Sequence, residues 1–137
     1  MKYWLLVADA STYGFDELER DGTAVWDGIR GSLAQKHLRE MRRGDQAVIY
    51  HTAPAKAAVG TARVTSDAYP DPKDREAKLV VADLEPARRF DHAVALAALR
   101  ENEKLAGMTF LKIQRIAVSP LEKKEYDEIV RMGSPRK

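Results

Sequence analysis

The sequence predicts an α+β fold, with a mixed or largely antiparallel sheet and flanking helices. Strand-like runs concentrate in the middle of the 137 residues, and the segments with helical periodicity lie before and after them. This order differs from the strand–helix alternation of parallel α/β folds. The length suits one hydrophobic core, so we expect residues 1–137 to form a single domain.

The first elements follow from local patterns near the amino terminus. Residues 3–7 form an uninterrupted apolar run with aromatic members, which favours a buried strand. A short helix is expected within residues 11–22, because acidic residues and a leucine lie between turn residues and Gly22 can supply a left-handed stop.

A longer helix is predicted from Ser32. Ser32 and Gln35 have the spacing of a capping box, and apolar residues three and four positions apart give the segment one hydrophobic face. Arg42 and Arg43 would lie in the last turn, where the helix dipole favours cations, and Gly44 would end the helix.

The centre of the chain predicts three strands. Residues 46–52 and 58–66 are separated by a short loop and are expected to pair antiparallel. Tyr69–Pro72 contains two prolines in four residues and predicts an irregular loop. A further strand is expected from about Lys78 to about Leu84 or beyond, because this run has a continuous apolar centre.

The carboxyl-terminal third predicts helices around one last strand. One or two short helices are expected within residues 94–107, and the final strand within residues 115–118. The last helix is predicted with Ser119 as its cap, Pro120 as its first residue and Glu122 completing a capping box.

Composition excludes several classes of protein. The chain has no cysteine, so it has no disulfide and no zinc site built on thiolates, which points to the cytoplasm. The first apolar run is short and ends at Asp9, which indicates a strand rather than a signal peptide or a membrane span. A net charge of +2 is compatible with an anionic polymer as partner. We expect a cytoplasmic protein with no membrane segment, and a monomer is favoured.

Motifs for metal or nucleotide chemistry are absent from the sequence. The three histidines are not spaced like a metal-binding pair on one helix turn, and neither GxGxxG nor GxxxxGK[ST] occurs. A GxSxG nucleophile motif is also missing. We therefore expect no metal, no cofactor and no enzymatic activity.

One candidate binding position combines a large aromatic with a turn signal. Trp26 precedes Asp27 and Gly28, shortly before the predicted helix at Ser32. Two interpretations are open: Trp26 lines a ligand site at the rim of an element, or it is a core tryptophan that fastens the turn to the sheet.

Two further positions have the same two interpretations. Tyr50, His51 and Thr52 place three hydrogen-bonding side chains at the end of a predicted strand, where they either contact a ligand or satisfy the strand end. Tyr69 lies in the proline-rich loop, where it either contacts a ligand or covers the core.

Together these side chains suit a planar nucleobase. A base needs aromatic groups to stack on its faces and polar groups to bond its edge. Arg30, Arg39, Arg42 and Arg43 are candidates to contact phosphates. The last three equally fit an ordinary solvated helix face.

Seven segments resemble one known family. They read KYWLL, TAVWDGIRG, LREMRRGDQAVIYHT, VGTARV, AYPDP, KIQRIAVSPL and EYDEIVRMG. The same segments occur in this order in the EVE domain family, which the chain resembles from about Lys2 to about Gly133.

The resemblance implies a PUA-like pseudo-barrel, with a mixed, largely antiparallel sheet and flanking helices. It also implies a non-enzymatic module that binds DNA or RNA and takes a modified or flipped base, such as a DNA cytosine derivative or an RNA base, in an aromatic pocket. In the family's Tyr-His-Ser motif, Thr52 replaces the serine. The residues assigned to the base or ligand on this basis are Trp26, Asp27, Gly28, Ile29, Arg30, Tyr50, His51, Thr52 and Tyr69.

Two segments depart from the usual pattern of the family. Residues 7–10 read VADA where the family has Lys-Ser-Glu-Pro, and residues 30–36 read RGSLAQK where it has Arg-Asn-Tyr-Gln-Ala-Arg-Asn. A lysine, an asparagine and an arginine are therefore missing from the surface that the resemblance assigns to the ligand.

Two alternative functions stay open. A small nuclease or hydrolase acting on nucleic acid in the same cleft would use Asp27, Asp71 or His51 as its acid or base. Alternatively, the diverged surface would bind a small ligand or a protein partner.

Overall fold

The computed structural model describes residues 1–76, 78–113 and 116–134. The strands are β1 (Tyr3–Ala8), β2 (Ala24–Trp26), β3 (Gln46–His51), β4 (Ala57–Val64), β5 (Tyr69–Pro70), β6 (Val80–Ala95) and β7 (Val118–Leu121). The helices are α1 (Phe15–Asp21), α2 (Ser32–Arg39), α3 (Leu96–Glu101), the 3-10 helix η1 (Glu103–Leu105), α4 (Thr109–Lys112) and α5 (Lys123–Gly133).

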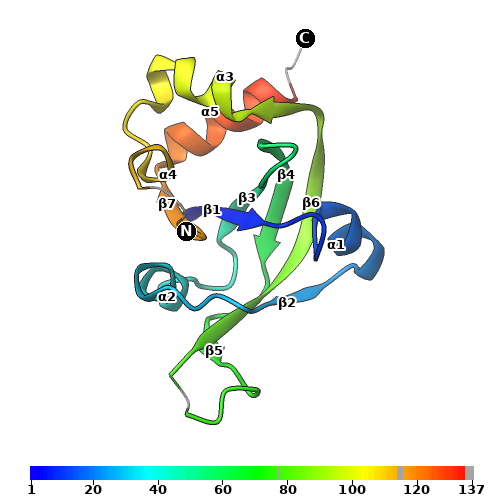
Figure 1. Ribbon diagram of the computed structural model, residues 1–137, viewed down its shortest axis with the longest axis vertical. Coiled ribbons are helices and arrows are strands. Elements are labelled where there is room, and N and C mark those ends of the chain that lie inside the picture. Colours follow the sequence, from blue (N-terminus) through cyan, green and yellow to red (C-terminus); the bar gives the residue numbers. More distant parts are fainter. Residues whose placement is uncertain (77, 114–115, 135–137) are drawn as a thin grey trace.

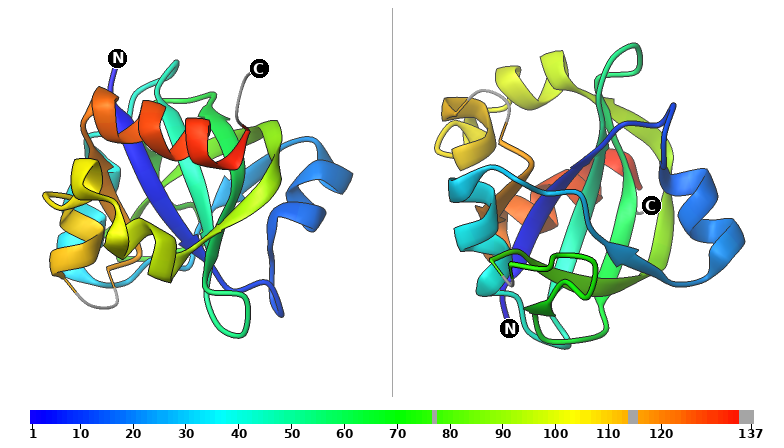
Figure 2. Two further views of the ribbon diagram at one scale, coloured as in Figure 1. Left: turned by 90° about the horizontal axis from the view of Figure 1, so that it is seen from above. Right: turned by 60° about the horizontal axis from the view of Figure 1, so that its bottom comes forward.

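The seven strands form one curled, mixed sheet (Figures 1 and 2). Its order is β2-β6-β4-β3-β1-β7, and β5 adds to β6. β1 and β3 are parallel, and the other pairings are antiparallel. The predicted α+β class is confirmed, as are the strands near residues 46–52 and 58–66 and their antiparallel pairing.

A hydrophobic core lies on each face of the sheet, because successive side chains of a strand point to opposite faces. In β3, Ala47 and Ile49 join one core with α1, α2 and β2. Val48 and Tyr50 join the other core, under α3, η1 and α5. The strand that carries the candidate residues therefore divides them between two faces.

Helix α1 has the expected stop at Gly22, whose φ of 76° is left-handed. Helix α2 differs from its prediction at both ends. Gly31 is the N-cap and Ser32 is the first helical residue, so the predicted capping box with Gln35 is wrong. The helix ends at Arg39, so Arg42 and Arg43 lie beyond its last turn and not in it.

Gly44 does adopt a left-handed conformation, with a φ of 97°, but it belongs to the turn that leads into β3. In this turn the Asp45 N–H donates to the Arg42 carbonyl at 3.0 Å, and the Gly44 N–H donates to Val64 of β4 at 2.8 Å. The sequence therefore correctly marked Gly44 as a point where the chain turns. It did not mark the end of α2, which lies before a separate turn that is hydrogen-bonded to β4.

The expected irregular loop at Tyr69–Pro72 is only partly correct. Tyr69 and Pro70 form β5, because they pair with Val81 and Val80 of β6. The predicted strand from about Lys78 continues as β6 through Ala95, with register shifts where it passes β4. Such irregularities let one strand follow the curl of the sheet.

The end of the chain also differs from its prediction. The expected helices within residues 94–107 are confirmed by α3 and η1. The last strand is Val118–Leu121, and the predicted start at Arg115 lies outside the described residues. Ser119 and Pro120 pair with β1, so neither starts the helix. Glu122 is the N-cap of α5.

Among the described residues, no helix combines the length and the apolarity needed to cross a membrane.

Candidate functional site

A cleft of about 590 Å³ opens where β1 ends, beside α1 and β2. It is lined by residues 7–9, 12–13, 21 and 23–29. Small-molecule sites commonly enclose about 300–1,000 Å³, so the cleft is large enough for one. Its walls are brought together by the fold, since β1 and β2 lie on opposite sides of β3, β4 and β6 in the sheet order.

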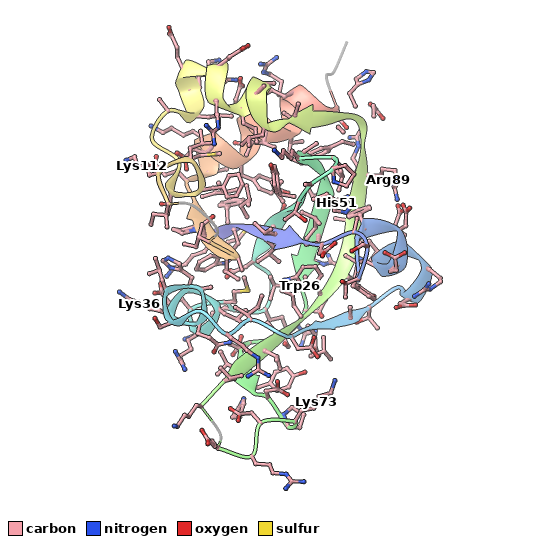
Figure 3. All side chains as sticks on the ribbon, viewed as in Figure 1. Trp26, Lys36, His51, Lys73, Arg89 and Lys112 are labelled. Carbon is pink, nitrogen blue, oxygen red and sulfur yellow. The ribbon has the colours of Figure 1, made fainter. Side chains whose placement is uncertain are left out.

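Trp26 forms part of the wall as the last residue of β2, paired with Ala82 of β6. The sequence placed it on a turn, but the strand includes it. Its side chain is 7% exposed and belongs to the core on this face of the sheet. Trp26, which Figure 3 labels, therefore fastens β2 to the core and also contributes to the cleft.

Tyr13 is a second aromatic wall that the sequence analysis missed. Its ring meets Trp26 edge to face, with centroids 6.5 Å apart at 76°. The Tyr13 hydroxyl donates to the Asp21 carboxylate at 2.8 Å. Burial, followed by the bond to Asp21, raises the pKa of Tyr13 to about 12. The available signal was a tyrosine in a Gly-containing turn directly after the first strand.

The polar lining of the cleft is acidic. Asp9, Asp21 and Asp27 line it, and no Lys, Arg or His does so among the described residues. A hydrogen bond from the Ser11 hydroxyl lowers the pKa of Asp9, and bonds from Arg20 and Tyr13 lower the pKa of Asp21. Asp27 accepts from the Lys73 ammonium at 3.3 Å. The cleft therefore offers mainly hydrogen-bond acceptors to a ligand.

The loop after Trp26 is held in place by Gln35 of α2. Gly28 turns the loop with a φ of 77°, and Ile29 returns it toward the cleft. The Gln35 amide nitrogen donates to the carbonyls of Ile29 at 2.7 Å and Val80 at 3.1 Å. Its amide oxygen accepts the Val80 N–H at 2.9 Å. Gln35 is 2% exposed, so these bonds fix one rim of the cleft to β6 in a buried setting.

His51 supports the opposite side of the cleft rather than lining it. Its Nε2 accepts the Phe15 N–H at 3.0 Å, at the start of α1. Burial lowers the pKa of His51, which favours the neutral ring that this bond requires. Arg89 of β6 also holds α1, through Asp16, Glu19 and the Phe15 ring (Figure 3).

Thr52 donates its backbone N–H to Ala8 at 3.0 Å, which ties β3 to the end of β1. Its side chain is not part of the cleft lining.

Tyr50 lies on the other face of the sheet, away from Trp26. It is 4% exposed and packs on Phe110, with ring centroids 4.8 Å apart. The structure therefore does not bring Tyr50 and Trp26 together, because Tyr50 and His51 point to opposite faces of β3.

Tyr69 is engaged within the sheet at β5. Its hydroxyl donates to the Asp83 carboxylate at 2.6 Å, and this bond is the main cause that raises its pKa to about 12. Asp71 accepts the Lys73 N–H at 2.9 Å. Neither Tyr69 nor Asp71 lines the cleft, so of the three candidate acids and bases only Asp27 does.

The candidate arginines lie outside the cleft, on α2 and its flanks. Arg39 donates to the Lys78 carbonyl at 2.6 Å, and Arg42 donates to the Arg39 carbonyl at 2.9 Å. Arg42 and Arg43 border a second hollow of about 550 Å³.

Within the described ranges, no group of three or more acidic or histidine side chains is placed to hold a metal ion.

The curled mixed sheet with its flanking helices defines a PUA-like pseudo-barrel. The fold is shared by a protein of Rhodopseudomonas palustris solved by NMR, with a TM-score of 0.91 and 34% identity, covering 97% of this chain and 93% of that one. It is also shared by human THYN1, crystallised in complex with DNA containing 5-methylcytosine. In that case the TM-score is 0.89 and the identity 22%, with both chains covered in full (100%).

The EVE domain model matches residues 2–132, so the chain belongs to the EVE domain family. The resemblance found in the sequence is thereby confirmed. Among curated proteins, mouse thymocyte nuclear protein 1 is 25% identical, over 93% of this chain and 72% of its own length. The human protein is also 25% identical, and the alignment spans 58% of its length, so these relatives are longer than the region they share with this chain.

Proposed function

We propose that this protein is a non-enzymatic module that binds nucleic acid and takes one base into the Trp26 cleft. The observation that carries the proposal is the cleft itself, which combines two aromatic walls with a lining of hydrogen-bond acceptors. The complex of human THYN1 with DNA containing 5-methylcytosine supports this choice of partner, since the two proteins share a fold.

The lining favours a base whose edge carries hydrogen-bond donors. Carboxylates accept hydrogen bonds from the exocyclic amine of cytosine, and the aromatic wall suits stacking on its face. Ala24 lies on the same face of β2 as Trp26 and lines the same cleft, which offers an apolar contact to a methyl group. A methylated cytosine is therefore the base that we propose for this cleft.

The residues of the site divide by role in this proposal. The base contacts come from Trp26 and the loop that follows it, residues 27–29. His51 and Thr52 act through α1 and β1, which they hold in place.

The test compares oligonucleotides that differ only at one position. A labelled strand carries 5-methylcytosine, cytosine or an abasic residue there, and binding is followed by fluorescence anisotropy. We expect tighter binding to the methylated base than to the abasic strand, and Trp26→Ala to remove the difference by losing a stacking contact of about 1–3 kcal/mol. Tyr50→Phe, on the opposite face, is the control and keeps the difference.

Circular dichroism establishes that the variants are folded. Equal affinity for the abasic and the base-containing strands, measured on folded wild-type protein, refutes base binding in this cleft.

A further inference from the structure

Five cations are concentrated on α2 and its flanks. They are Arg30, Lys36, Arg39, Arg42 and Arg43. In the part of the chain that the structure describes, none of the five has a carboxylate oxygen within 4.0 Å. Glu40 is the one acidic residue in this segment, and its carboxylate contacts Lys2 at 3.3 Å. We call residues 30–43 the basic strip.

The basic strip begins at the cleft. Arg30 directly follows Ile29, which lines the cleft and is bonded to Gln35 of α2. Lys36 points outward from α2 in Figure 3. The strip ends at the second hollow, where Arg42 and Arg43 lie beside Lys2.

The other side of the cleft has the opposite charge. Helix α1 reads FDELERD, with four acidic residues and one arginine. That arginine, Arg20, contacts Asp21 at 2.9 Å, and Arg89 of β6 contacts Asp16 and Glu19. With four acidic residues and two arginines, α1 and Arg89 together still carry a formal net charge of −2. A phosphate backbone is attracted to the basic strip and repelled by α1.

We propose that the sugar-phosphate backbone of the bound strand leaves the cleft only on the side of the basic strip and follows the strip from there. This inference rests on the proposed function, because it assumes that a base occupies the Trp26 cleft. The eight residues of α2 span about 12 Å at about 1.5 Å per residue. At about 3.4 Å per nucleotide along one strand, this length corresponds to roughly three to four nucleotides.

The members of the strip have different freedom to contact phosphates. The guanidinium groups of Arg39 and Arg42 each donate to a carbonyl, which fixes their direction. Arg30, Lys36 and Arg43 are exposed and make no side-chain hydrogen bond within the described residues, so these three are available to follow the backbone.

The experiment uses short single strands with 5-methylcytosine at one end. One strand is extended by four nucleotides on the 5′ side of the base, and the other on the 3′ side. We expect one extension to tighten binding at least tenfold and the other to change it less than twofold. In the tight complex, Lys36→Gln/Arg43→Gln should reduce the slope of log K against log salt by about 1.4, or about 0.7 per lost phosphate contact.

The matched control neutralises two exposed cations near the other face of the sheet: Arg100 of α3, and Lys112 of α4, which Figure 3 labels. Arg100→Gln/Lys112→Gln should leave the slope unchanged. The one-sided path is overturned if both extensions increase the affinity equally or if neither increases it. It is also overturned if the control variant lowers the salt slope as much as Lys36→Gln/Arg43→Gln does. These outcomes are separate from base binding, because an abasic strand tests the cleft independently of the extensions.

Discussion

The side-chain amide nitrogen of Gln35 lies 2.7 Å from the carbonyl oxygen of Ile29 and so connects helix α2 to the loop at the rim of the cleft. The same amide bonds both backbone groups of Val80, at the start of β6. The loop after Trp26 and the start of β6, which lies 45 positions from Gln35 in the sequence, therefore meet on one buried side chain. The position of the Trp26–Ile29 wall depends on α2, although α2 does not line the cleft.

Replacing Gln35 should destabilise both the fold and the cleft. Gln35→Leu keeps a buried side chain but leaves the carbonyl of Ile29 and the two groups of Val80 without this partner, at about 1–3 kcal/mol for each group that water does not reach. We expect a lower urea midpoint and weaker binding of the methylated strand. Lys36→Ala, one residue further on the exposed face, is the control for stability. An unchanged midpoint in Gln35→Leu contradicts this role.

The free energy of unfolding should decrease as the pH is lowered below neutrality, because of His51. Burial lowers its pKa in the folded protein, so the unfolded chain binds the proton more readily. The stabilisation by neutral His51 is complete above its ordinary pKa of about 6.5 and decreases as the pH falls below that value. Protonation also removes the acceptor for the Phe15 N–H.

The measurement compares urea midpoints between pH 7.5 and pH 5.5 for wild type and His51→Gln. Glutamine does not titrate in this range, so the variant should lose less stability on acidification than the wild type. His37→Gln is the matched comparison, because burial lowers the pKa of His37 as well. If His51→Gln and the wild type lose stability equally, His51 does not cause the pH dependence.

A side chain at Gly60 should displace α1. A Cβ there would lie 2.7 Å from the carbonyl oxygen of Arg88 and 2.7 Å from the end of the Phe15 ring. Gly60→Ala should therefore cost about 1–3 kcal/mol through overpacking. Gly107→Ala is the control, since none of the described atoms approaches its Cβ within 4 Å. Equal midpoints for the two variants in urea would show that Phe15 moves aside without cost.

Removing the Ser119 hydroxyl should not destabilise the protein. Ser119 is fully buried in β7, and its oxygen has no hydrogen-bond partner within the described residues. Burial without a partner costs about 1–3 kcal/mol, so Ser119→Ala is expected to be neutral or stabilising despite the small space it leaves. Thermal unfolding of the two proteins checks this, and a clear loss in the variant would indicate that the hydroxyl is bonded.

The elements with strong local signals were predictable from the sequence. The apolar runs of β1, β3 and β4 and the stop of α1 at Gly22 depend on neighbouring residues alone. The capping predictions at Ser32 and Ser119 were wrong for a physical reason. Each serine has the right spacing for a cap, but Ser119 pairs with Leu5 of β1, and Gln35 bonds Ile29 and Val80 instead of the helix start.

The candidate site was predictable in part. Trp26 and the loop after it were found because an aromatic beside a turn signal is visible locally. Tyr13 was missed, since its contact with Trp26 requires β1 and β2 to be brought together across the sheet. Tyr50 was assigned to the same site as Trp26 because it is a hydrogen-bonding residue at a strand end and matches the family's Tyr-His-Ser motif, yet the strand places Tyr50 in the other core.

The sequence by itself determined the α+β class, most of the strands and the family, because these depend on local periodicity and on ordered motifs. The tertiary structure alone decided the strand order, the face on which each aromatic lies, and the meeting of Trp26, Tyr13 and three aspartates in one cleft. The physical reason is that long-range pairing sets the direction of each side chain. A shift of one residue in register moves a side chain to the opposite face of the sheet.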